Sequence, residues 1–328
     1  MTTRRQFLRN ASAVTLAGAL AANSSVSAAN TTFSSNNAKK TFGLQIYSLT
    51  VNRNDLEFTN NIPAGLKRIA QMGYSTIELA GYNAEGKIGE VPIKEFKKYA
   101  DDAGLKIIST HVNPPMREYT FPNSERGITG NIEQAKEFWK KATDHHAAIG
   151  CKYIIQPGQP STRNIEEVKA VGEAFNEFGK IAKAAGLIFG FHNHSGEFER
   201  VVSKGREILP KNWAWGELPE NVMIYDGMLE ATDPDLVIFE NDVYWTVMAQ
   251  QDPVAYMKKY ANRIRVLHIK DIAVLGESGM MNFQKIFETA YANGITEFIV
   301  ELEGYRGGSQ FEGVKGCADY LTKASFVK

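Results

Sequence analysis

The sequence predicts an α/β protein built as a single-domain (β/α)8 TIM barrel. Three observations predict it. Eight short apolar segments follow one another along the chain, helical patterns lie between them, and five of those patterns end at a glycine directly before an apolar run. Strands that alternate with helices at roughly 30–50 residues per unit are typical of a parallel sheet. Eight such units in one chain of this length are typical of a closed barrel.

The composition is that of an ordinary globular protein. The chain has 328 residues, 43% of them hydrophobic, with 37 basic and 37 acidic side chains and a formal net charge of zero. These values exclude wholesale disorder, collagen and coiled coil. Balanced charge disfavours a nucleic-acid partner, which usually requires a basic excess. Two cysteines, Cys151 and Cys317, are too few for a disulfide framework or a cysteine zinc site.

The N-terminal residues are predicted to be an export signal. The pair Arg4-Arg5 stands in a segment that resembles a twin-arginine motif, an apolar run follows over residues 11–22, and small residues flank Ser27. We therefore expect a signal peptide over residues 1–29, a polar linker over 30–40, the barrel over 41–328, and a periplasmic location. An apolar run of about a dozen residues is too short to be a stable membrane anchor.

Eight apolar, β-branched segments are the predicted strands, because a strand buried on both faces needs apolar side chains throughout. They cover residues 43–47, 76–80, 106–111, 153–156, 188–194, 237–242, 265–270 and 297–302. An open doubly wound sheet is the alternative arrangement. The first strand is not followed by a glycine-rich dinucleotide fingerprint, which weakens that alternative.

Apolar stripes at helical spacing predict the intervening helices, as at Trp139 and Ala142, at Phe175 and Phe178, and again over residues 283–290. Helical patterns end at Gly73, Gly104, Gly150, Gly186 and Gly294. Glycine tolerates the left-handed backbone conformation that ends a helix. In the third helix, we interpret His145 and His146 as a surface pair.

Polar side chains end seven of the eight predicted strands, on the side of a barrel where active sites form. These side chains are Glu78, His111, Gln156, His192, His194, Glu240, Asp242, His268, Lys270, Glu301 and Glu303. A period of two places His192 with His194, and Glu240 with Asp242, on one face of their strands. Burying so many ionisable groups without a cation would be very costly. Mixed imidazoles and carboxylates therefore predict one divalent ion, Mn, Co, Zn, Fe or Mg.

Taken together, these motifs resemble the xylose isomerase-like barrels, the family of sugar phosphate isomerases and epimerases. The resemblance spans residues 41–321 and rests on the segments 190–198, 239–245, 267–271 and 300–301. It implies metal ligands on four adjacent strands, at His192, Asp242, His268 and Glu301. Many members have a glutamate in place of His192 that also serves the epimerases as a base. His192 and His194 therefore stay open as the ligand from this strand.

The resemblance implies an enzyme that removes a proton beside the carbonyl of a sugar or keto-sugar, with the ion stabilising the enediolate. The base candidates are His194, Glu197 and Glu301. Lys270 either holds an oxyanion or forms an ion pair with Asp242 or Glu240. Isomerisation or epimerisation is expected. A lyase or hydratase acting on a 3-keto-glycoside is one alternative. A non-catalytic periplasmic sugar-binding barrel is another. A metal-dependent phosphodiesterase is disfavoured, because it would require more metal ligands and a basic groove.

Five residues are candidates for binding a small carbohydrate substrate, and they are Glu78, His111, Gln156, Trp213 and Trp215. Aromatic faces stack on sugar rings; alternatively, the two tryptophans pack on the barrel rim. Glu78 either contacts a sugar hydroxyl or pairs with the first strand or with a lysine. A homodimer is compatible with the sequence.

Overall fold

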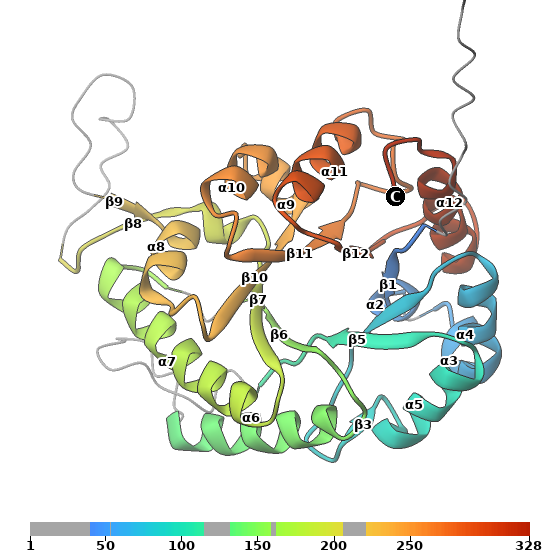
Figure 1. Cartoon of the computed structure of the whole chain (residues 1–328), viewed down its shortest axis with the longest axis horizontal. Helices are drawn as coiled ribbons and strands as arrows, with labels where there is room; N and C mark the ends of the chain where they lie inside the picture. Colours follow the sequence, from blue (N-terminus) through green and yellow to red (C-terminus); the bar gives the residue numbers. More distant parts are fainter. Residues whose placement is uncertain (1–39, 53, 115–131, 159–161, 206–220) are drawn as a thin grey trace, which may run out of the picture. The chain divides into compact units, whose positions relative to one another are not determined.

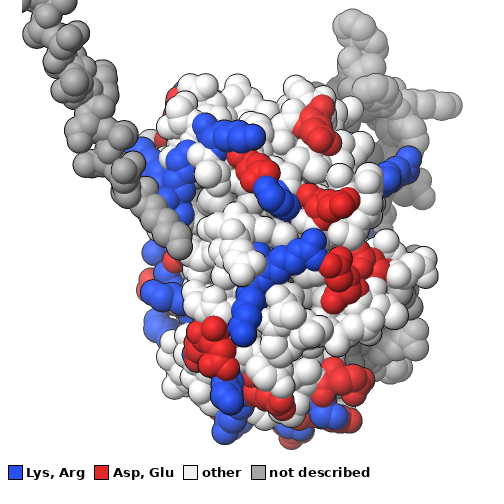
Figure 2. All heavy atoms as spheres, turned by 90° about the vertical axis from the view of Figure 1, so that its right-hand side faces the viewer, with Lys and Arg blue, Asp and Glu red and all other residues white. Residues whose placement is uncertain are grey.

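The computed structural model describes residues 40–52, 54–114, 132–158, 162–205 and 221–328. The predicted signal peptide and all but the last residue of the linker lie outside the described residues, as do Trp213 and Trp215. Within the described ranges, no helix combines the length and the apolar character needed to cross a membrane. Basic and acidic side chains are interspersed over the face shown in Figure 2.

Eight parallel strands form the barrel (Figure 1) and confirm the predicted fold class. They are β1 (Gly43–Gln45), β2 (Thr76–Leu79), β5 (Lys106–Thr110), β6 (Tyr153–Pro157), β7 (Ile188–His192), β10 (Val237–Asp242), β11 (Ile264–Ile269) and β12 (Glu297–Val300). Their hydrogen-bonded order is β5-β2-β1-β12-β11-β10-β7-β6. The ends meet because the Val112 amide donates to the Ile155 carbonyl at 2.8 Å, and the Lys152 amide to that of Ile108 at 3.0 Å.

Helices surround the strands on the outside of the barrel (Figure 1). The longer ones are α4 (Ile62–Gln71), α5 (Ile93–Asp102), α6 (Ile132–Ala147), α7 (Ile165–Ala184), α8 (Ile224–Ala231), α11 (Phe283–Ala292) and α12 (Gln310–Lys323). The shorter ones are α2 (Tyr47–Thr50), α3 (Glu57–Asn60), α9 (Val243–Met248), α10 (Pro253–Lys259) and the 3-10 turn η1 (Gly196–Phe198). Two hairpins, β3 (Lys87–Ile88) with β4 (Val91–Pro92) and β8 (Arg200–Val202) with β9 (Asn221–Met223), lie outside the barrel sheet. The five glycines predicted to end helices all have positive φ, between 73° and 106°.

The predicted helical stripes pack against the strands as aromatic clusters. The Trp139 ring of α6 lies 5.4 Å from the Phe178 ring of α7 and 5.0 Å from the Phe189 ring of β7, centroid to centroid. Phe175 contacts Phe189 at 5.4 Å. Each ring is fully buried. Burial of such side chains contributes about 1.5–3 kcal/mol each, so these contacts fix α6 and α7 on the barrel.

The barrel interior has an apolar floor beneath a polar upper part. The floor consists of Tyr153, Ile155, Ile238, Val266 and Ile299. Two residues further along their strands come Glu240, His268 and Glu301, which share the inward face because side chains alternate with a period of two. A Cβ on Gly190 would lie 3.2 Å from side-chain atoms of both Ile155 and Ile238. The floor is therefore tightly packed, and the polar groups are held at the C-terminal ends of the strands.

The interpretation of His145 and His146 as a surface pair is wrong. His146 is completely buried, and its Nδ1 donates to the Ala142 carbonyl at 2.7 Å. Its ring packs 4.8 Å from that of Tyr82, while His145 contacts the Tyr82 hydroxyl at 2.9 Å. Burial lowers the pKa of His146 to about 4. The last turn of α6 packs against the segment that follows β2, so the uncharged imidazole of His146 is buried in the core.

We predict that His146→Gln makes the protein less sensitive to acid. The folded-state pKa of about 4 lies below the ordinary value of 6.5, so the unfolded chain binds the proton first as pH falls. The free energy of unfolding therefore decreases as the pH falls from 6.5 to 4, and the decrease caused by this histidine approaches about 3 kcal/mol. Urea unfolding at pH 7.5 and 4.5 measures the loss, with His145→Gln as control. An equal loss in His146→Gln and the wild type would contradict the assignment.

Candidate functional site

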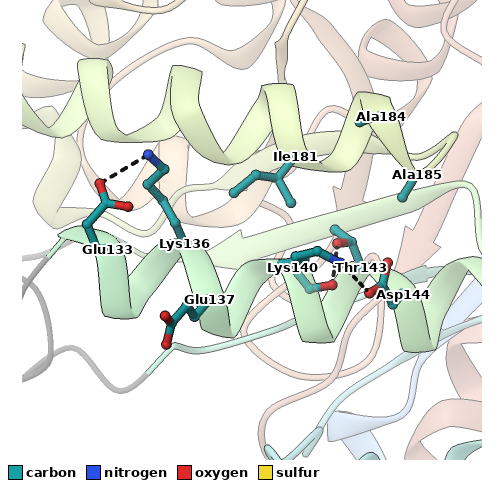
Figure 3. Close-up of a pocket in the computed structure, with 9 residues that line it drawn as sticks. All are labelled: Glu133, Lys136, Glu137, Lys140, Thr143, Asp144, Ile181, Ala184 and Ala185. Carbon is teal, nitrogen blue, oxygen red and sulfur yellow. Dashed lines mark hydrogen bonds and ion pairs between the residues drawn. The ribbon is translucent and has the colours of Figure 1, made fainter.

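A cavity of about 460 Å³ opens where the barrel strands end. His111, His192, His194, Glu301 and Glu303 line it. Its volume lies in the range of small-molecule sites. Another cavity, of about 450 Å³, lies between α6 and α7, where Lys136 and Lys140 form exposed ion pairs with Glu133 and Asp144 (Figure 3). The histidines and buried carboxylates gather at the first of these two cavities.

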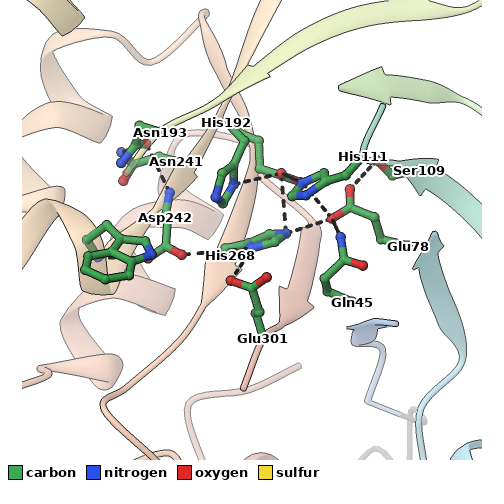
Figure 4. Close-up of polar contacts among 12 residues, drawn as sticks. Gln45, Glu78, Ser109, His111, His192, Asn193, Asn241, Asp242, His268 and Glu301 are labelled. Carbon is green, nitrogen blue, oxygen red and sulfur yellow. Dashed lines mark hydrogen bonds and ion pairs between the residues drawn. The ribbon is translucent and has the colours of Figure 1, made fainter. Parts of the chain in front are cut away.

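Four buried side chains come together beside this cavity, and we call them the quartet: His192, Asp242, His268 and Glu301 (Figure 4). One ligand atom from each lies within 4.8 Å of the others. Adjacent parallel strands position them, since Asp242 of β10 is in register with His268 of β11. The structure thus brings together the four residues that the sequence predicted.

The quartet has the donor atoms and unmet hydrogen-bonding capacity that suit a divalent cation. Nδ1 of His268 lies 3.6 Å from Glu301 Oε2 and 4.0 Å from Asp242 Oδ2. Neither that nitrogen nor Asp242 Oδ2 has a hydrogen-bond partner among the described residues. The other Asp242 oxygen accepts from the Trp245 amide at 2.9 Å. Orphaned buried polar atoms are costly, and two imidazoles with two carboxylates fit an ion such as Mn, Co, Zn or Fe.

Below the quartet lies a second set of polar side chains, which we call the lower group: Glu78, His111 and Glu240. Nε2 of His111 lies 3.0 Å from Glu78 Oε1 and 2.7 Å from Glu240 Oε2. Glu78 also accepts hydrogen bonds from Gln45 of β1, at 2.6 Å, and from the Ser109 hydroxyl. Glu78 is fully buried. Of the two roles expected for Glu78, the structure supports pairing with the first strand, while His111 does line the cavity.

Charges in the lower group compensate one another. Burial acts against ionisation of Glu78, but His111 and His268 hold its pKa well below the usual range. Burial likewise acts against protonation of His111, yet the charges of Glu78 and Glu240 raise its pKa to about 9. Burial together with the Glu78 charge raises the pKa of Glu240 to about 7. The imidazolium of His111 is therefore the counter-charge of the Glu78 carboxylate, and it also contacts Glu240.

Lys270 is a buried cation at the edge of the quartet. Its Nζ lies 3.0 Å from Glu301 Oε2, 2.5 Å from Glu303 Oε1 and 4.0 Å from Asp242 Oδ2, and it sits 4.7 Å above the Trp245 ring. Although burial opposes its charge, Asp242 and Glu301 raise its pKa to about 12. The expected ion pair is present, but its nearest partners are the two glutamates after β12 rather than Asp242 or Glu240.

His194 and Glu197, the other base candidates, have different surroundings. His194 is half-buried and lines the cavity, with its ring 5.0 Å from that of His192. Burial lowers the pKa of His194 to about 4, so its imidazole is neutral near pH 7. Glu197 does not line the cavity; its carboxylate accepts from the His194 amide at 2.8 Å. Glu197 thus holds the backbone that carries His194.

Three amide side chains support the site. Gln156 is fully buried and donates to the Gly158 carbonyl at 3.1 Å. It does not line the cavity, which a residue that contacts substrate would do. Asn193 accepts at Oδ1 from the Asn241 amide group at 3.0 Å and from the Asp242 backbone at 3.2 Å. Sequence reasoning missed Asn193 and Asn241 as residues that tie β7 to β10. Their central places in the His-Asn-His and Glu-Asn-Asp motifs were the available signal.

Residues 66–323 match the model of the xylose isomerase-like TIM barrel family. An inosose dehydratase from Clostridium perfringens is 31% identical over 240 residues, which cover 66% of this chain and 73% of that protein. The solved structure of a sugar phosphate isomerase/epimerase from Parabacteroides distasonis is 46% identical, with a TM-score of 0.81, and covers 90% of this chain and 100% of that one.

A more distant structure shares the fold alone. The 3-keto-D-glucoside 4-epimerase from E. coli superposes with a TM-score of 0.58 at 17% identity, covering 86% of this chain and 97% of that chain. Similarity at that identity shows the barrel and its strand order but not the chemistry.

We predict that Lys270→Met strongly destabilises the protein, because it leaves Glu301 and Glu303 without their buried cation. Removing one partner of a buried pair typically costs about 3–5 kcal/mol. Lys180→Met on α7, which breaks an exposed pair with Glu177, should cost less than about 1 kcal/mol. Urea unfolding followed by tryptophan fluorescence measures both. Equal, small losses would show that Lys270 contributes no more than a surface lysine.

Proposed function

Because the chain belongs to the xylose isomerase-like TIM barrel family, we propose that it is a metal-dependent enzyme that removes a proton beside the carbonyl of a keto-sugar or a related cyclic ketone. The chain is an enzyme of the sugar isomerase and epimerase type, with a dehydratase among its relatives. The quartet is the observation that carries the proposal, since four ligand atoms within 4.8 Å of one another lie beside the cavity.

The quartet would hold one divalent ion through two histidines and two carboxylates. A bound divalent ion supplies positive charge that stabilises the oxyanion formed when the proton leaves. Glu78 and Glu240 of the lower group do not line the cavity and contact the quartet histidines instead. Lys270 fixes Glu301 through an ion pair at 3.0 Å. These contacts keep the ligands in place before substrate binds, so little reorganisation is needed during the reaction.

His194 is the residue best suited to take the proton. It lines the cavity and is neutral near pH 7, so a nitrogen lone pair is free to accept the proton. Glu197 is engaged with the His194 backbone, and Glu301 is both a quartet member and the partner of Lys270. We assign Glu197 and Lys270 as positioning residues and His194 as the base.

A single base favours elimination over epimerisation. In elimination, His194 takes the proton beside the carbonyl, the C–H electron pair forms a C=C bond, and the β-substituent leaves with the C–O electron pair. The same imidazolium then returns the proton to the leaving oxygen. Inversion of one carbon requires delivery of a proton from the opposite face. The similarity to an inosose dehydratase supports elimination, on an inositol-derived ketone or a 3-keto-glycoside.

Isomerisation or epimerisation is the second candidate. The 46% identity to the sugar phosphate isomerase/epimerase from Parabacteroides distasonis supports it. It shares the first step, proton removal beside the carbonyl, but a proton then returns to carbon and no C–O bond breaks. The two outcomes therefore separate by product analysis rather than by the identity of the base.

We predict that the metal-loaded protein converts a ketone substrate in a reaction that depends on His194. Metal-loaded protein incubated in deuterated water with an inosose, 3-keto-glucosides and free ketoses should yield an unsaturated ketone with loss of water or of the aglycone. Deuterium in an intact sugar skeleton would instead show isomerisation or epimerisation. His194→Ala should bind the ion normally and lose about 10²–10⁴-fold in rate, whereas His192→Ala should lose both ion and activity.

Two results would contradict these assignments. If His194→Ala loses the ion while His192→Ala retains it, the two roles are reversed. If metal-loaded wild-type protein neither exchanges deuterium nor converts any of the three substrate classes, the proposed chemistry is wrong. Mass spectrometry and NMR of the products, with metal analysis of each variant, supply the readouts.

We further propose that the protein is exported to the periplasm in folded form, on the basis of Arg4-Arg5 and the apolar run that follows. Replacing both arginines by lysine should trap the precursor in the cytoplasm. Cell fractionation with immunoblotting measures it, with Arg9→Lys as the matched control. Unchanged periplasmic yield of the double variant would contradict twin-arginine export.

A further inference from the structure

Each histidine of the quartet has two ring nitrogens, and only one can bind the ion. The choice is set by the hydrogen bond that the other nitrogen makes. His192 and His268 are both buried, and each contacts a carboxylate of the lower group (Figure 4). The partners of each nitrogen therefore decide which one is presented to an ion in the quartet.

For His268, the two nitrogens face opposite ways. Nε2 lies 2.8 Å from Glu78 Oε1 and 3.3 Å from Glu240 Oε2, in the lower group. Nδ1 lies on the side of Glu301 and Asp242, at 3.6 and 4.0 Å, without a hydrogen-bond partner among the described residues. Nδ1 is thus the nitrogen that faces the other quartet ligands.

For His192, the arrangement is the reverse. Its Nδ1 lies 3.0 Å from Glu240 Oε2. No hydrogen bond or ion pair within the described part of the chain involves Nε2, and His192 lines the cavity. Nε2 is therefore the nitrogen available to the quartet. The two histidines come from strands on either side of β10, and each is held from below by a carboxylate.

We propose that Glu78 and Glu240 are positioning residues that make the two histidines bind the ion through opposite nitrogens, His268 through Nδ1 and His192 through Nε2. The inference rests on the divalent ion of the proposed function. A carboxylate that accepts from the non-binding N–H fixes both the tautomer and the ring orientation of a ligand histidine. In this barrel, two such carboxylates act on two ligands.

The lower group is built to keep these carboxylates in place. Glu78 accepts from Gln45 and Ser109, which come from the neighbouring strands β1 and β5. His111 lies between Glu78 and Glu240 and contacts both. Its ring stacks on that of His268, with centroids 5.1 Å apart and planes 14° apart. The carboxylates are therefore unable to rotate freely toward the quartet.

An ion in the lower position is the competing arrangement. His111, His192, Glu240 and His268 also offer ligand atoms within 4.8 Å of one another. That position requires the nitrogens that already face Glu240 Oε2, at 2.7 to 3.3 Å. The carboxylate oxygen stands among the three imidazoles, where an ion would have to lie. An ion in this lower position would be bound by His192 Nδ1 and His268 Nε2, the opposite pair of atoms from those proposed.

Nitrogen NMR distinguishes the two arrangements directly. Full-length mature protein labelled with ¹⁵N-histidine and loaded with Zn²⁺, a diamagnetic probe, reports for each ring which nitrogen binds metal and which carries the proton. We expect a metal-bound Nδ1 in His268 and a metal-bound Nε2 in His192. Binding of both through the same type of nitrogen, or through the opposite pair, would overturn the inference. Failure of the wild type to bind Zn²⁺ would instead refute the proposed metal site.

Variants test the part played by each carboxylate. Glu240→Gln should alter the ¹⁵N signals of His192 most, and Glu78→Gln those of His268, with Zn²⁺ bound about 10–100-fold more weakly in each. Asp271→Asn is the charge-matched control, because this buried carboxylate after β11 accepts from the backbone amides of Ile272 and Gly276. Equal weakening in all three variants, with unchanged histidine signals, would show a general charge effect and contradict the positioning role.

Discussion

Burial of unlike charges at the ends of parallel strands is the constraint on which the rest of the site depends. The barrel closes through the contacts of β5 with β6, so strand-end side chains face one volume rather than solvent. Carboxylates and cations there alternate, from Glu78 through His111 to Glu240, and from Glu301 to Lys270. Each of these charges is tolerable because a partner of the opposite sign touches it. The floor below is apolar and offers these charges no oppositely charged side chain as a partner.

The barrel could be predicted from simple periods in the sequence, whereas the members of the quartet were predicted from the family resemblance together with the strand faces that a period of two defines. Alternation along a strand determines which face Asp242 and His268 occupy, and glycine at helix ends marks each unit. Alternation does not determine how deep in the barrel each of these side chains lies. Strand register places Glu240 beside His192 and Asp242 beside His268, and that register depends on the tilt of the whole barrel.

Other features were missed for related reasons. Gln45 carries no motif, and its contact with Glu78 arises only once β1 and β2 pair. Glu197 is close to His194 in sequence, but a 3-10 turn directs its carboxylate to the backbone. His146 lies on a helix face that the hairpin after β2 covers through Tyr82. In each case a tertiary contact, not a local pattern, decides the role of the side chain.

Many members of the family have a glutamate where this chain has His192, and the histidine changes the net charge of the proposed metal site. Two carboxylates and two neutral imidazoles leave the charge of a divalent ion balanced, whereas a third carboxylate would leave the site negative. A balanced site opposes an oxyanion less, and it also lacks a carboxylate base from β7. In the proposed reaction, proton transfer would therefore fall to His194, which follows the proposed metal ligand His192 at the same strand end.

The most direct test is the position of the ion itself. Anomalous scattering from crystals of the Mn²⁺-loaded protein locates it without reference to activity. One peak bonded to His192, Asp242, His268 and Glu301 is expected, with Glu78 and Glu240 outside the coordination sphere. A peak among His111, His192, Glu240 and His268, or no peak near these strands in protein that retains catalytic activity, would contradict it.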